Sequence, residues 1–216
     1  MVELELLPSF IKICGITSTQ DAEYAIDAGA TAIGLVFATS PRKIDIATGK
    51  TISEYSKNRI LRVGVFKDQS DEEILSIIEN VELDCAQLHS PLSSELEKAL
   101  RNLNIAVIKA MSVGTDEIDK FDEHRVAAIL IDGPSPGSGE DHAWGDVQQN
   151  FFQRPMIAAG GLNTSNLSRI VTLTNAWGVD VSSGVEESPG KKNPAKVSDF
   201  VNKANKVFVQ PEDSNE

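Results

Sequence analysis

The sequence predicts an α/β protein that folds as a single-domain (β/α)8 barrel. Eight short, apolar, β-branched segments recur along the chain, and their starts lie 21 to 29 residues apart. Several of them are apolar on both faces, which is typical of parallel strands buried between a core and a layer of helices. The 216 residues leave about 27 for each of eight strand–helix units, which suits a compact barrel. An open doubly wound sheet is the alternative.

The eight strands are expected, in chain order, at Phe10–Cys14, Thr31–Phe37, Ile60–Phe66, Leu83–Leu88, Ile105–Met111, Val126–Asp132, Pro155–Ala159 and Trp177–Ser183. Apolar residues at helical spacing behind capping residues predict the clearer helices, which are Thr19–Ala28, Ser70–Glu79, Ser93–Leu100, Asn163–Thr172 and Pro194–Val207. Asp116–Asp122 and Gly145–Asn150 are expected to be short or irregular helices. Capping boxes are expected at Ser70 and Ser94, because a glutamate follows each serine after three residues.

The domain organisation follows from composition. No linker rich in proline, glycine or serine divides the chain, so residues 10–208 are expected to form one barrel. Residues 1–9 read as a short N-terminal extension. Residues 209–216 read as an acidic, disordered tail.

Charge and cysteine content disfavour several classes of function. The chain has 20 lysines and arginines against 32 aspartates and glutamates, a net charge of −12, so nucleic acid and anionic membrane surfaces are poor partners. Its two cysteines cannot form a disulfide framework, and neither belongs to a metal-binding pair. No signal peptide or membrane span is recognisable, so a cytoplasmic location is expected.

Polar residues end five of the predicted strands. Such residues lie at Cys14, at Gln87 and His89, at Asp132, at Gly160 and Gly161, and from Asp180 to Gly184. The carboxyl ends of the strands and the loops after them form the active face of a (β/α)8 barrel. Polar strand ends that converge on this face predict an enzyme.

The turns after the seventh and eighth strands favour a phosphate site. Barrels commonly bind phosphate there through backbone N–H groups, and Gly160-Gly161 and Ser182-Ser183-Gly184 lie in these turns. Glycine allows close approach of the anion, and Ser183 adds a hydroxyl. Plain turn chemistry is the alternative, since tight turns need glycine in any case. The ligand would be a small phosphorylated metabolite.

Cys14 and Asp132 are the candidates for proton transfer. A thiol at the mouth could be favoured as thiolate by a neighbouring cation or helix dipole, although most free cysteines are small buried hydrophobes. An acid that ends an apolar strand is costly unless paired, solvated or catalytic, although Asp132 could also cap a turn before Gly133. Cys85 is expected to be core. A cysteine base opposite an aspartic acid suits an isomerase.

The strand-end motifs resemble those of phosphoribosylanthranilate isomerase, a single-domain barrel of tryptophan biosynthesis. The resemblance spans residues 10–205 and is carried by Lys12-Ile-Cys-Gly-Ile-Thr17, Gly34-Leu-Val-Phe37, Ser40-Pro-Arg42, Arg62-Val-Gly-Val-Phe66, Gln87-Leu-His89, Leu130-Ile-Asp132, Gly137-Ser-Gly139 with Trp144, Ala159-Gly-Gly-Leu-Asn163, Val179-Asp-Val-Ser-Ser-Gly-Val-Glu186 and Pro189-Gly-Lys-Lys192. The first and the penultimate of these segments are highly specific together.

The resemblance implies an Amadori rearrangement of N-(5'-phosphoribosyl)anthranilate to 1-(2-carboxyphenylamino)-1-deoxyribulose 5-phosphate, without metal or organic cofactor. Asp132 would be the general acid that protonates the furanose ring oxygen. Cys14, as thiolate, would remove the proton from ribose C2. A thiol with an ordinary pKa near 8.5 would need its pKa lowered to serve well near neutral pH.

The resemblance also implies the binding residues. Arg42 would lie near the anthranilate carboxylate, for which a guanidinium is a good bidentate partner. Gly160, Gly161, Ser182, Ser183 and Gly184 would build the phosphate site. Asp180 would repel phosphate, so it would position the loop or contact a ribose hydroxyl. Gln87 and His89 would line the mouth, and His89 could equally be structural.

Two departures and three rivals remain. The loop from Phe37 to Arg42 is one residue shorter than in many relatives, and Lys43 stands where an aromatic residue often follows the arginine. Ser135–His142 reads as a mobile flap over the substrate.

Three other functions are the rivals: a sugar-phosphate epimerase, the analogous isomerase of the histidine pathway, and a non-catalytic barrel. The histidine-pathway isomerase would be expected to carry an aspartate in place of Cys14. The expected partner is a small-molecule substrate, and the sequence leaves monomer or homodimer open.

Overall fold

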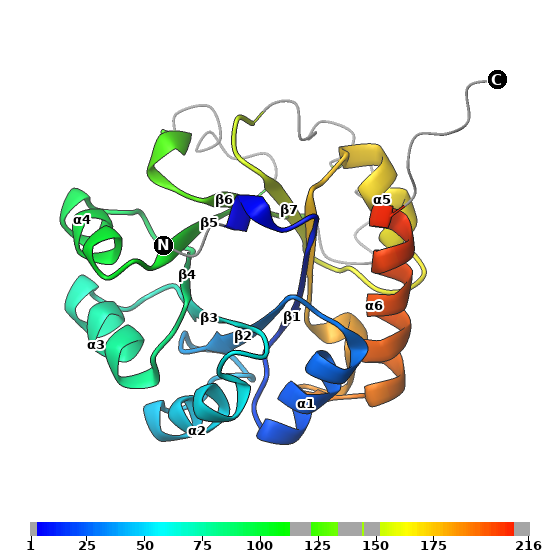
Figure 1. Ribbon diagram of the computed structural model, residues 1–216, viewed down its shortest axis with the longest axis horizontal. Coiled ribbons are helices and arrows are strands. Elements are labelled where there is room, and N and C mark those ends of the chain that lie inside the picture. The colour runs from blue at the N-terminus through cyan, green and yellow to red at the C-terminus, as the bar shows by residue number, and fades with distance from the viewer. Residues whose placement is uncertain (1–3, 113–121, 134–143, 145–151, 210–216) are drawn as a thin grey trace.

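The computed structural model describes residues 4–112, 122–133, 144 and 152–209. Eight parallel strands close into a barrel in sequence order, β1 to β8, as Figure 1 shows in a view along its axis. β1 pairs with both β2 and β8, which closes the ring and confirms the predicted barrel over the open sheet. The strands are β1 (Phe10–Cys14), β2 (Ala32–Val36), β3 (Leu61–Phe66), β4 (Cys85–Leu88), β5 (Ala106–Ser112), β6 (Ala128–Asp132), β7 (Met156–Ala159) and β8 (Gly178–Val181).

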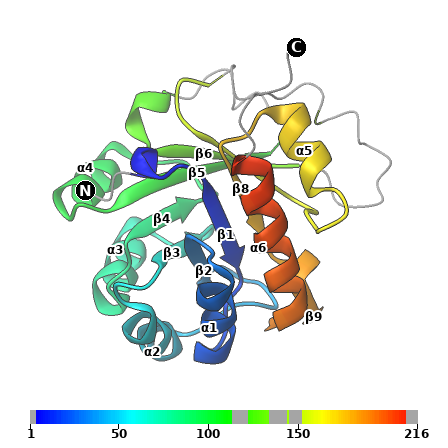
Figure 2. The ribbon, with the colours of Figure 1, turned by 45° about the vertical axis from the view of Figure 1, so that its right-hand side comes forward.

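Helices surround the barrel on its outer side (Figure 1). They are α1 (Thr19–Ala28), α2 (Ile46–Ser56), α3 (Asp71–Val81), α4 (Ser94–Asn102), α5 (Leu167–Thr174) and α6 (Pro194–Val209). α6 packs against α1 and α5, and Figure 2 shows it running beside β1. These helices cover the outward apolar faces of the strands that they pack against.

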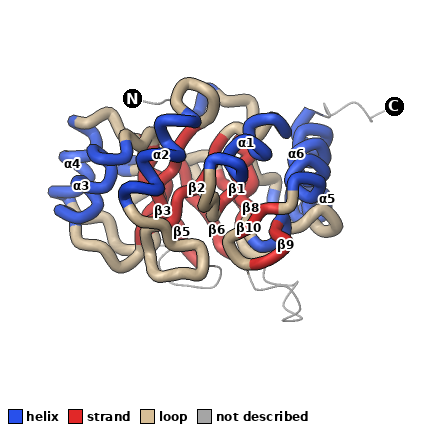
Figure 3. Tube along the Cα trace, turned by 90° about the horizontal axis from the view of Figure 1, so that it is seen from below, coloured by secondary structure: helices blue, strands red, loops and turns tan. Residues whose placement is uncertain are grey.

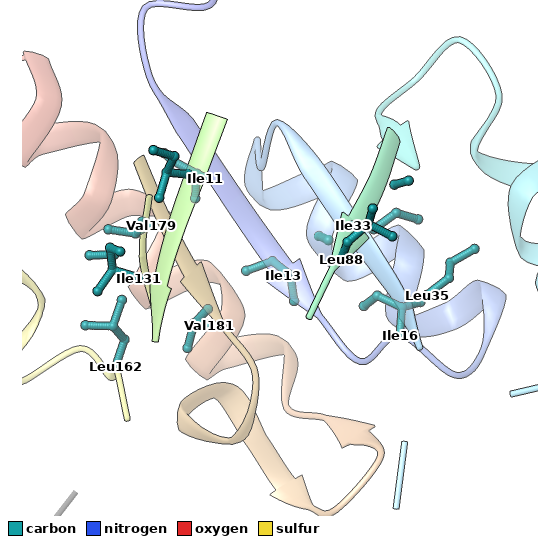
Figure 4. Packing of buried hydrophobic residues seen from close by; sticks show 14 of the residues in the cluster. Ile11, Ile13, Ile16, Ile33, Leu35, Leu88, Ile131, Leu162, Val179 and Val181 are labelled. Carbon is teal, nitrogen blue, oxygen red and sulfur yellow. The ribbon is translucent and has the colours of Figure 1, made fainter. Parts of the chain in front are cut away.

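The two faces of each strand enter two different hydrophobic clusters. Ile11 and Ile13 of β1 belong to the outer cluster with the apolar faces of the helices, and Figure 4 shows this layer with Ile33 and Val179. Phe10 belongs to the inner cluster, which includes Leu130 and other small or branched residues. Because side chains alternate along a strand, Lys12 and Cys14 share the inward face with Phe10. This alternation positions the functional groups in the barrel interior.

Local capping explains where several helices begin. α3 carries the predicted capping box, in which the Ser70 hydroxyl accepts from the Glu73 N–H and the Glu73 carboxylate accepts from the Ser70 N–H. The capping box expected at Ser94 is wrong. Ser93 is the N-cap of α4 and accepts from the Leu96 N–H. The glutamate that Ser94 would need, Glu97, binds Arg101 and Arg125 instead.

One predicted helix begins later in the structure, one observed helix was not anticipated, and two predicted helices are not tested. α5 begins at Leu167 and not at Asn163, because the Asn163 side chain accepts from the backbone N–H groups of Ser165 and Asn166 and holds a turn there. α2 was not anticipated, since Gly49 and its threonines and serines are weak helix formers. The expected helix Gly145–Asn150 lies outside the described residues, as does the expected helix Asp116–Asp122 except for its last residue.

Both ends of the barrel carry extra structure. Leu4–Leu6 form a 3-10 turn, η1, and Leu4 is fully buried in the inner cluster, so this segment closes the N-terminal end of the strands. After β8 come a 3-10 turn, η6 (Ser183–Val185), and a hairpin of β9 (Glu186–Ser188) and β10 (Lys191–Lys192). Figure 3 shows the hairpin at the end of the barrel opposite the N-terminus. The expected disordered tail, from residue 210 onward, lies outside the described residues.

Candidate active site

A cavity of about 190 Å³ lies at the carboxyl ends of the strands. It is lined by Cys14, Val65, Gln87, His89, Leu130, Asp132, Ala159, Gly160, Gly161, Leu162, Asp180, Ser182 and Ser183. The structure therefore brings together all of the predicted site residues except Arg42 and Gly184, which lie beside the cavity. The predicted flap, Ser135–His142, lies outside the described residues.

Cys14 ends β1 and is almost fully buried. It is in register with Gly34 on β2, and a Cβ atom at Gly34 would lie only 2.7 Å from the Cys14 Sγ and 3.0 Å from the Lys12 Cε. The missing side chain thus leaves room for the thiol and the lysine together. Gly15, which follows Cys14, has a φ of 76°, a conformation that suits glycine, and it turns the chain away from the barrel.

Burial raises the pKa of the Cys14 thiol, because a thiolate is costly in a site shielded from water. The ammonium groups of Lys12 and Lys192 act in the opposite direction, and Lys12 has the larger effect of the two. The negative charge of Asp180 adds to the increase. The cations that the sequence analysis anticipated beside Cys14 are present, but in the free site they do not offset burial, and the thiol form dominates.

Asp132 ends β6 on another side of the cavity. Partial burial raises the pKa of its carboxyl group, the charge of Asp180 raises it further, and Lys12 opposes both. A carboxyl group with a raised pKa keeps its proton closer to neutral pH, as a proton donor requires. A Cβ atom at Gly160 would lie 2.6 Å from the Asp132 Oδ1, so the glycine leaves this carboxyl group room.

Lys12 and Asp180 form a buried ion pair on neighbouring strands. The Lys12 Nζ donates to the Asp180 Oδ2 over 2.9 Å, and the two residues are register partners across β1 and β8. Burial alone would lower the pKa of Lys12, but Asp180 and Cys14 raise it above its usual value, so the ammonium form persists. The Asp180 Oδ1 is buried with no hydrogen-bond partner in the described parts of the chain, and Asp180 lines the cavity. It can accept from a ligand hydroxyl.

Gln87 and His89 form a neutral pair on and just after β4. The Gln87 Nε2 lies 3.1 Å from the His89 Nε2, and because the amide nitrogen only donates, the imidazole nitrogen accepts. Burial lowers the pKa of His89 to about 4, with Lys12 adding to the effect, so the ring is neutral at pH 7. The Gln87 Oε1 is buried, and none of the residues that the structure describes hydrogen-bonds it. Like the Asp180 Oδ1, it is available to a ligand donor.

The turns after β7 and β8 approach each other closely. Gly160 and Gly161 have φ values of 84° and 62°, a backbone that other residues rarely adopt. Gly184 packs against the β7 turn, where a Cβ atom would lie 2.0 Å from the Leu162 carbonyl oxygen. The Ser182 hydroxyl donates to the Cys14 carbonyl oxygen over 3.1 Å, which joins the β8 turn to the end of β1.

Arg42 lies beside Cys14 and is held by a carboxylate from the hairpin. Its Nε and Nη2 atoms each donate to Glu186 over 2.7 Å. The buried Lys192 Nζ donates to the same carboxylate over 2.8 Å. Burial favours a higher pKa for Glu186, but these two cations outweigh it and lower the pKa below its usual value. One edge of the guanidinium is therefore occupied within the protein.

Three charged residues of the site were not assigned roles from the sequence. Lys12, Glu186 and Lys192 are all buried, and each belongs to a motif quoted for the resemblance. A lysine inside an apolar strand was the available signal for Lys12, since lysine is almost never fully buried unless it is paired. Glu186 and Lys192 gave no such signal, because the hairpin that carries them was not anticipated.

In the described parts of the chain, no group of three or more histidine, cysteine, aspartate or glutamate side chains is arranged to hold a metal ion. No helix there is both long enough and apolar enough to cross a bilayer.

Comparison with known proteins shows which family the chain resembles. Residues 11–203 match the family model of N-(5'-phosphoribosyl)anthranilate isomerase. The N-(5'-phosphoribosyl)anthranilate isomerase of Oceanobacillus iheyensis is 40% identical over 197 residues, which cover 89% of this chain and 95% of the relative. The crystal structure of phosphoribosyl anthranilate isomerase from Thermotoga maritima is 33% identical with a TM-score of 0.79, covering 92% of this chain and 99% of the other.

A further solved structure of a phosphoribosyl anthranilate isomerase is a complex with reduced 1-(o-carboxyphenylamino)-1-deoxyribulose 5-phosphate. It is 32% identical with a TM-score of 0.77, and the match covers 92% of this chain and 99% of that one. The similarity extends over the whole barrel, including every strand that contributes to the cavity.

Proposed function

The chain belongs to the N-(5'-phosphoribosyl)anthranilate isomerase family, and from this premise we propose that its barrel mouth performs the rearrangement with Cys14 as base and Asp132 as acid. The reaction converts N-(5'-phosphoribosyl)anthranilate, an aminoaldose, to 1-(2-carboxyphenylamino)-1-deoxyribulose 5-phosphate, an aminoketose, in tryptophan biosynthesis. The single observation that carries the assignment of roles is that the Cys14 thiol and the Asp132 carboxyl group line one cavity from different strands.

Asp132 suits the first step, which opens the furanose ring. Protonation of the ring oxygen makes it a leaving group, while the anilino nitrogen supplies electrons and becomes a protonated Schiff base. The raised pKa of Asp132 keeps a proton available for this transfer. The carboxylate that remains faces the new positive charge and stabilises it.

Cys14 suits the second step, which removes the proton from ribose C2. The Schiff base withdraws electrons from the C1–C2 bond, so the loss of this proton gives a neutral enolamine. The enolamine then gains a proton at C1 and loses one from the C2 hydroxyl, which completes the ketone. The thiol must ionise before it can act, and the positive Schiff base adds to the effect of the lysines in favouring the thiolate.

The remaining residues bind the two ends of the substrate. The turns at Gly160-Gly161 and Ser182-Ser183-Gly184 would receive the phosphate, since glycine backbones allow close approach of an anion. Arg42 would pair with the anthranilate carboxylate through the part of its guanidinium that Glu186 does not use. The unpartnered Gln87 Oε1 and Asp180 Oδ1 would accept from sugar hydroxyls.

The proposal includes a location and a partner. A general base at Cys14 needs a free thiol, and both cysteines are free, so a reducing, cytoplasmic setting fits the chemistry. The phosphorylated substrate is the only partner that the proposed reaction requires.

The experiment follows the anthranilate-type fluorescence of freshly prepared phosphoribosylanthranilate after the purified protein is added. Rapid loss of fluorescence, with a ketone of unchanged mass as product, is expected. Heat-denatured protein is the control, because the substrate also hydrolyses spontaneously. Loss at the spontaneous rate, or release of free anthranilate as the main product, would contradict the proposed function.

A further inference from the structure

We propose that Lys12 is a positioning residue, whose buried ammonium group lies beside the Cys14 thiol and favours its thiolate form while Asp180 holds that ammonium in place. The inference rests on the proposed function in one respect, because it takes Cys14 to be the base. It concerns a residue to which neither the family match nor the sequence analysis assigns a role.

The geometry of β1, β2 and β8 carries the argument. Lys12 is fully buried, and its Nζ is fixed by the 2.9 Å bond to the Asp180 Oδ2 on the neighbouring strand. Gly34 on the opposite neighbour leaves a gap within 3.0 Å of both the Cys14 Sγ and the Lys12 Cε. The lysine side chain and the thiol are thus brought to the same place by the absence of one side chain.

The ion pair has a cost that stability alone does not explain. Taking a lysine and an aspartate out of water carries a large desolvation penalty, and well-packed apolar residues often replace such pairs without loss of stability. The pair also leaves the Asp180 Oδ1 buried with no hydrogen-bond partner among the described residues. An ammonium group placed beside the thiol gives the arrangement a chemical purpose.

Other charges also face Cys14, and they are compensated differently. Lys192 reaches the site from β10, but its Nζ is bound to the Glu186 carboxylate and the Ser182 carbonyl oxygen. Arg42 is bound to Glu186 by two hydrogen bonds. Asp132 and His89 line the same cavity, and His89 is neutral at pH 7. Lys12 is the cation whose side chain meets the Cys14 Sγ at the gap left by Gly34, and among the nearby charges it is the one that favours the thiolate most strongly.

Substitutions of the two members of the ion pair are expected to shift the ionisation of Cys14 in opposite directions. The Lys12 charge favours the Cys14 thiolate, whereas the Asp180 charge disfavours it. Lys12→Met removes the cation and keeps the length of the side chain, so the thiol should ionise at higher pH. Asp180→Asn removes the anion and keeps its shape, so the thiol should ionise at lower pH.

The experiment measures the rate at which iodoacetamide alkylates Cys14 against pH in the substrate-free protein, with the modified residue identified by mass spectrometry. For Lys12→Met the midpoint of the profile is expected to rise by about one pH unit or more, the size of effect that an opposite charge at close range produces. For Asp180→Asn it is expected to fall. Lys192→Met is the matched control, and its shift is expected to be smaller than that of Lys12→Met.

An unmoved midpoint in Lys12→Met, shifts of the same sign in both variants, or a larger shift in Lys192→Met would overturn the inference. Should Lys12→Met not fold, Asp180→Asn alone decides, because an unmoved or raised midpoint there contradicts the assignment. The assay contains no substrate, so it stands apart from the proposed function. A wild-type protein that fails to isomerise phosphoribosylanthranilate would sink the function and leave the ionisation result intact.

Discussion

Burial in the same cavity has opposite consequences for the proposed roles of Cys14 and Asp132. Burial raises the pKa of both groups. For Asp132 this helps the proposed role, because a general acid must hold its proton at working pH. For Cys14 it hinders the role, because a general base must lose its proton. The two lysines near the thiol, and the cationic intermediate that Asp132 would create, are the groups that reverse the penalty.

At the scale of single residues we predict that Asp132→Asn lowers kcat/KM by a factor of about 10² to 10⁴, the usual contribution of a general acid. A general acid works only when protonated, so activity that depends on Asp132 falls as pH rises through its pKa. The variant should lose this alkaline decline, and its residual rate should rise with pH as Cys14 ionises. The measurement is the pH profile of kcat/KM for both proteins. An unchanged alkaline decline in the variant would show that another group supplies the proton.

The predictable residues of the site were those that break a local pattern. Cys14 and Asp132 could be found because each ends an apolar strand with a reactive side chain. The bond between Lys12 and Asp180 joins residues 168 positions apart, so it depends on which strands become neighbours when the barrel closes. The pairing of Arg42 with Glu186 depends on the hairpin in the same way. Burial and ion pairing are properties of the closed ring.

Among the elements, the β9–β10 hairpin connects the loops around the mouth. Its Glu186 binds Arg42 from the loop after β2. The Gly190 carbonyl oxygen at its tip accepts from the Thr17 hydroxyl in the loop after β1, over 2.6 Å. The Lys192 backbone N–H donates to Asp21 of α1. The hairpin therefore fixes the loop that carries Arg42 relative to the end of β1.

We predict that Glu186→Gln raises KM by about tenfold or more, which corresponds to about 1.4 kcal/mol of lost binding, with a smaller effect on kcat. The neutral amide cannot hold Arg42 as the carboxylate does, and it leaves the buried Lys192 without its counterion. Breaking a buried pair from one side should also lower the free energy of unfolding by about 3 kcal/mol. Steady-state kinetics and denaturant unfolding measure the two effects.

Glu187→Gln is the matched control, since this neighbouring glutamate is exposed and forms its ion pair with the exposed Lys191. It should leave KM and stability unchanged. A normal KM in Glu186→Gln would mean that the hairpin does not position Arg42 for the substrate.

The type and order of most elements could be predicted from the sequence, whereas their boundaries depended on individual side chains. The predicted α1 and β1 have the observed bounds. The cap of α4 was predicted one residue too late, at Ser94 instead of Ser93. The glutamate expected to complete a capping box with Ser94, Glu97, accepts from Arg125 instead. α2 was missed because its composition opposes helix formation, and packing against α1 and α3 compensates in the folded protein.

At the scale of the whole molecule, the barrel separates stability from chemistry. The N-terminal ends of the strands are closed by η1, whose Leu4 is fully buried among inner-cluster residues, and the Trp177 Nε1 donates to the Leu7 carbonyl oxygen there. The opposite ends carry the cavity and the polar side chains. Because of this division, a substitution at the N-terminal ends of the strands can change stability without disturbing the cavity at their carboxyl ends.

We predict that Leu4→Ala lowers the free energy of unfolding by about 2 to 5 kcal/mol, the usual cost of removing a fully buried leucine, while kcat and KM stay near their wild-type values. Leu6→Ala provides the matched control, because Leu6 is 76% exposed in the same turn. Its effect should be within about 0.5 kcal/mol. Urea unfolding followed by circular dichroism measures both. Equal stability of the two variants would show that η1 does not close the barrel in solution.

The closed ring itself could be predicted because eight similar units follow one another in too few residues for long insertions. An open sheet was the alternative to the closed barrel, and the pairing of β1 with β8 decides between them. That pairing is also what places Lys12 beside Asp180. The architecture was therefore predictable in outline, while the electrostatics of the site emerge only from the ring.

The most direct measurement compares Cys14→Ala with Cys85→Ala in the assay for loss of phosphoribosylanthranilate fluorescence. The two variants carry the same change, but Cys14 lines the cavity, whereas Cys85 is fully buried in the inner cluster and is not among the lining residues. We expect Cys14→Ala to lose activity by a factor of about 10² or more, and Cys85→Ala to retain turnover. Full activity in a folded Cys14→Ala protein would contradict the assignment of the thiol as the base.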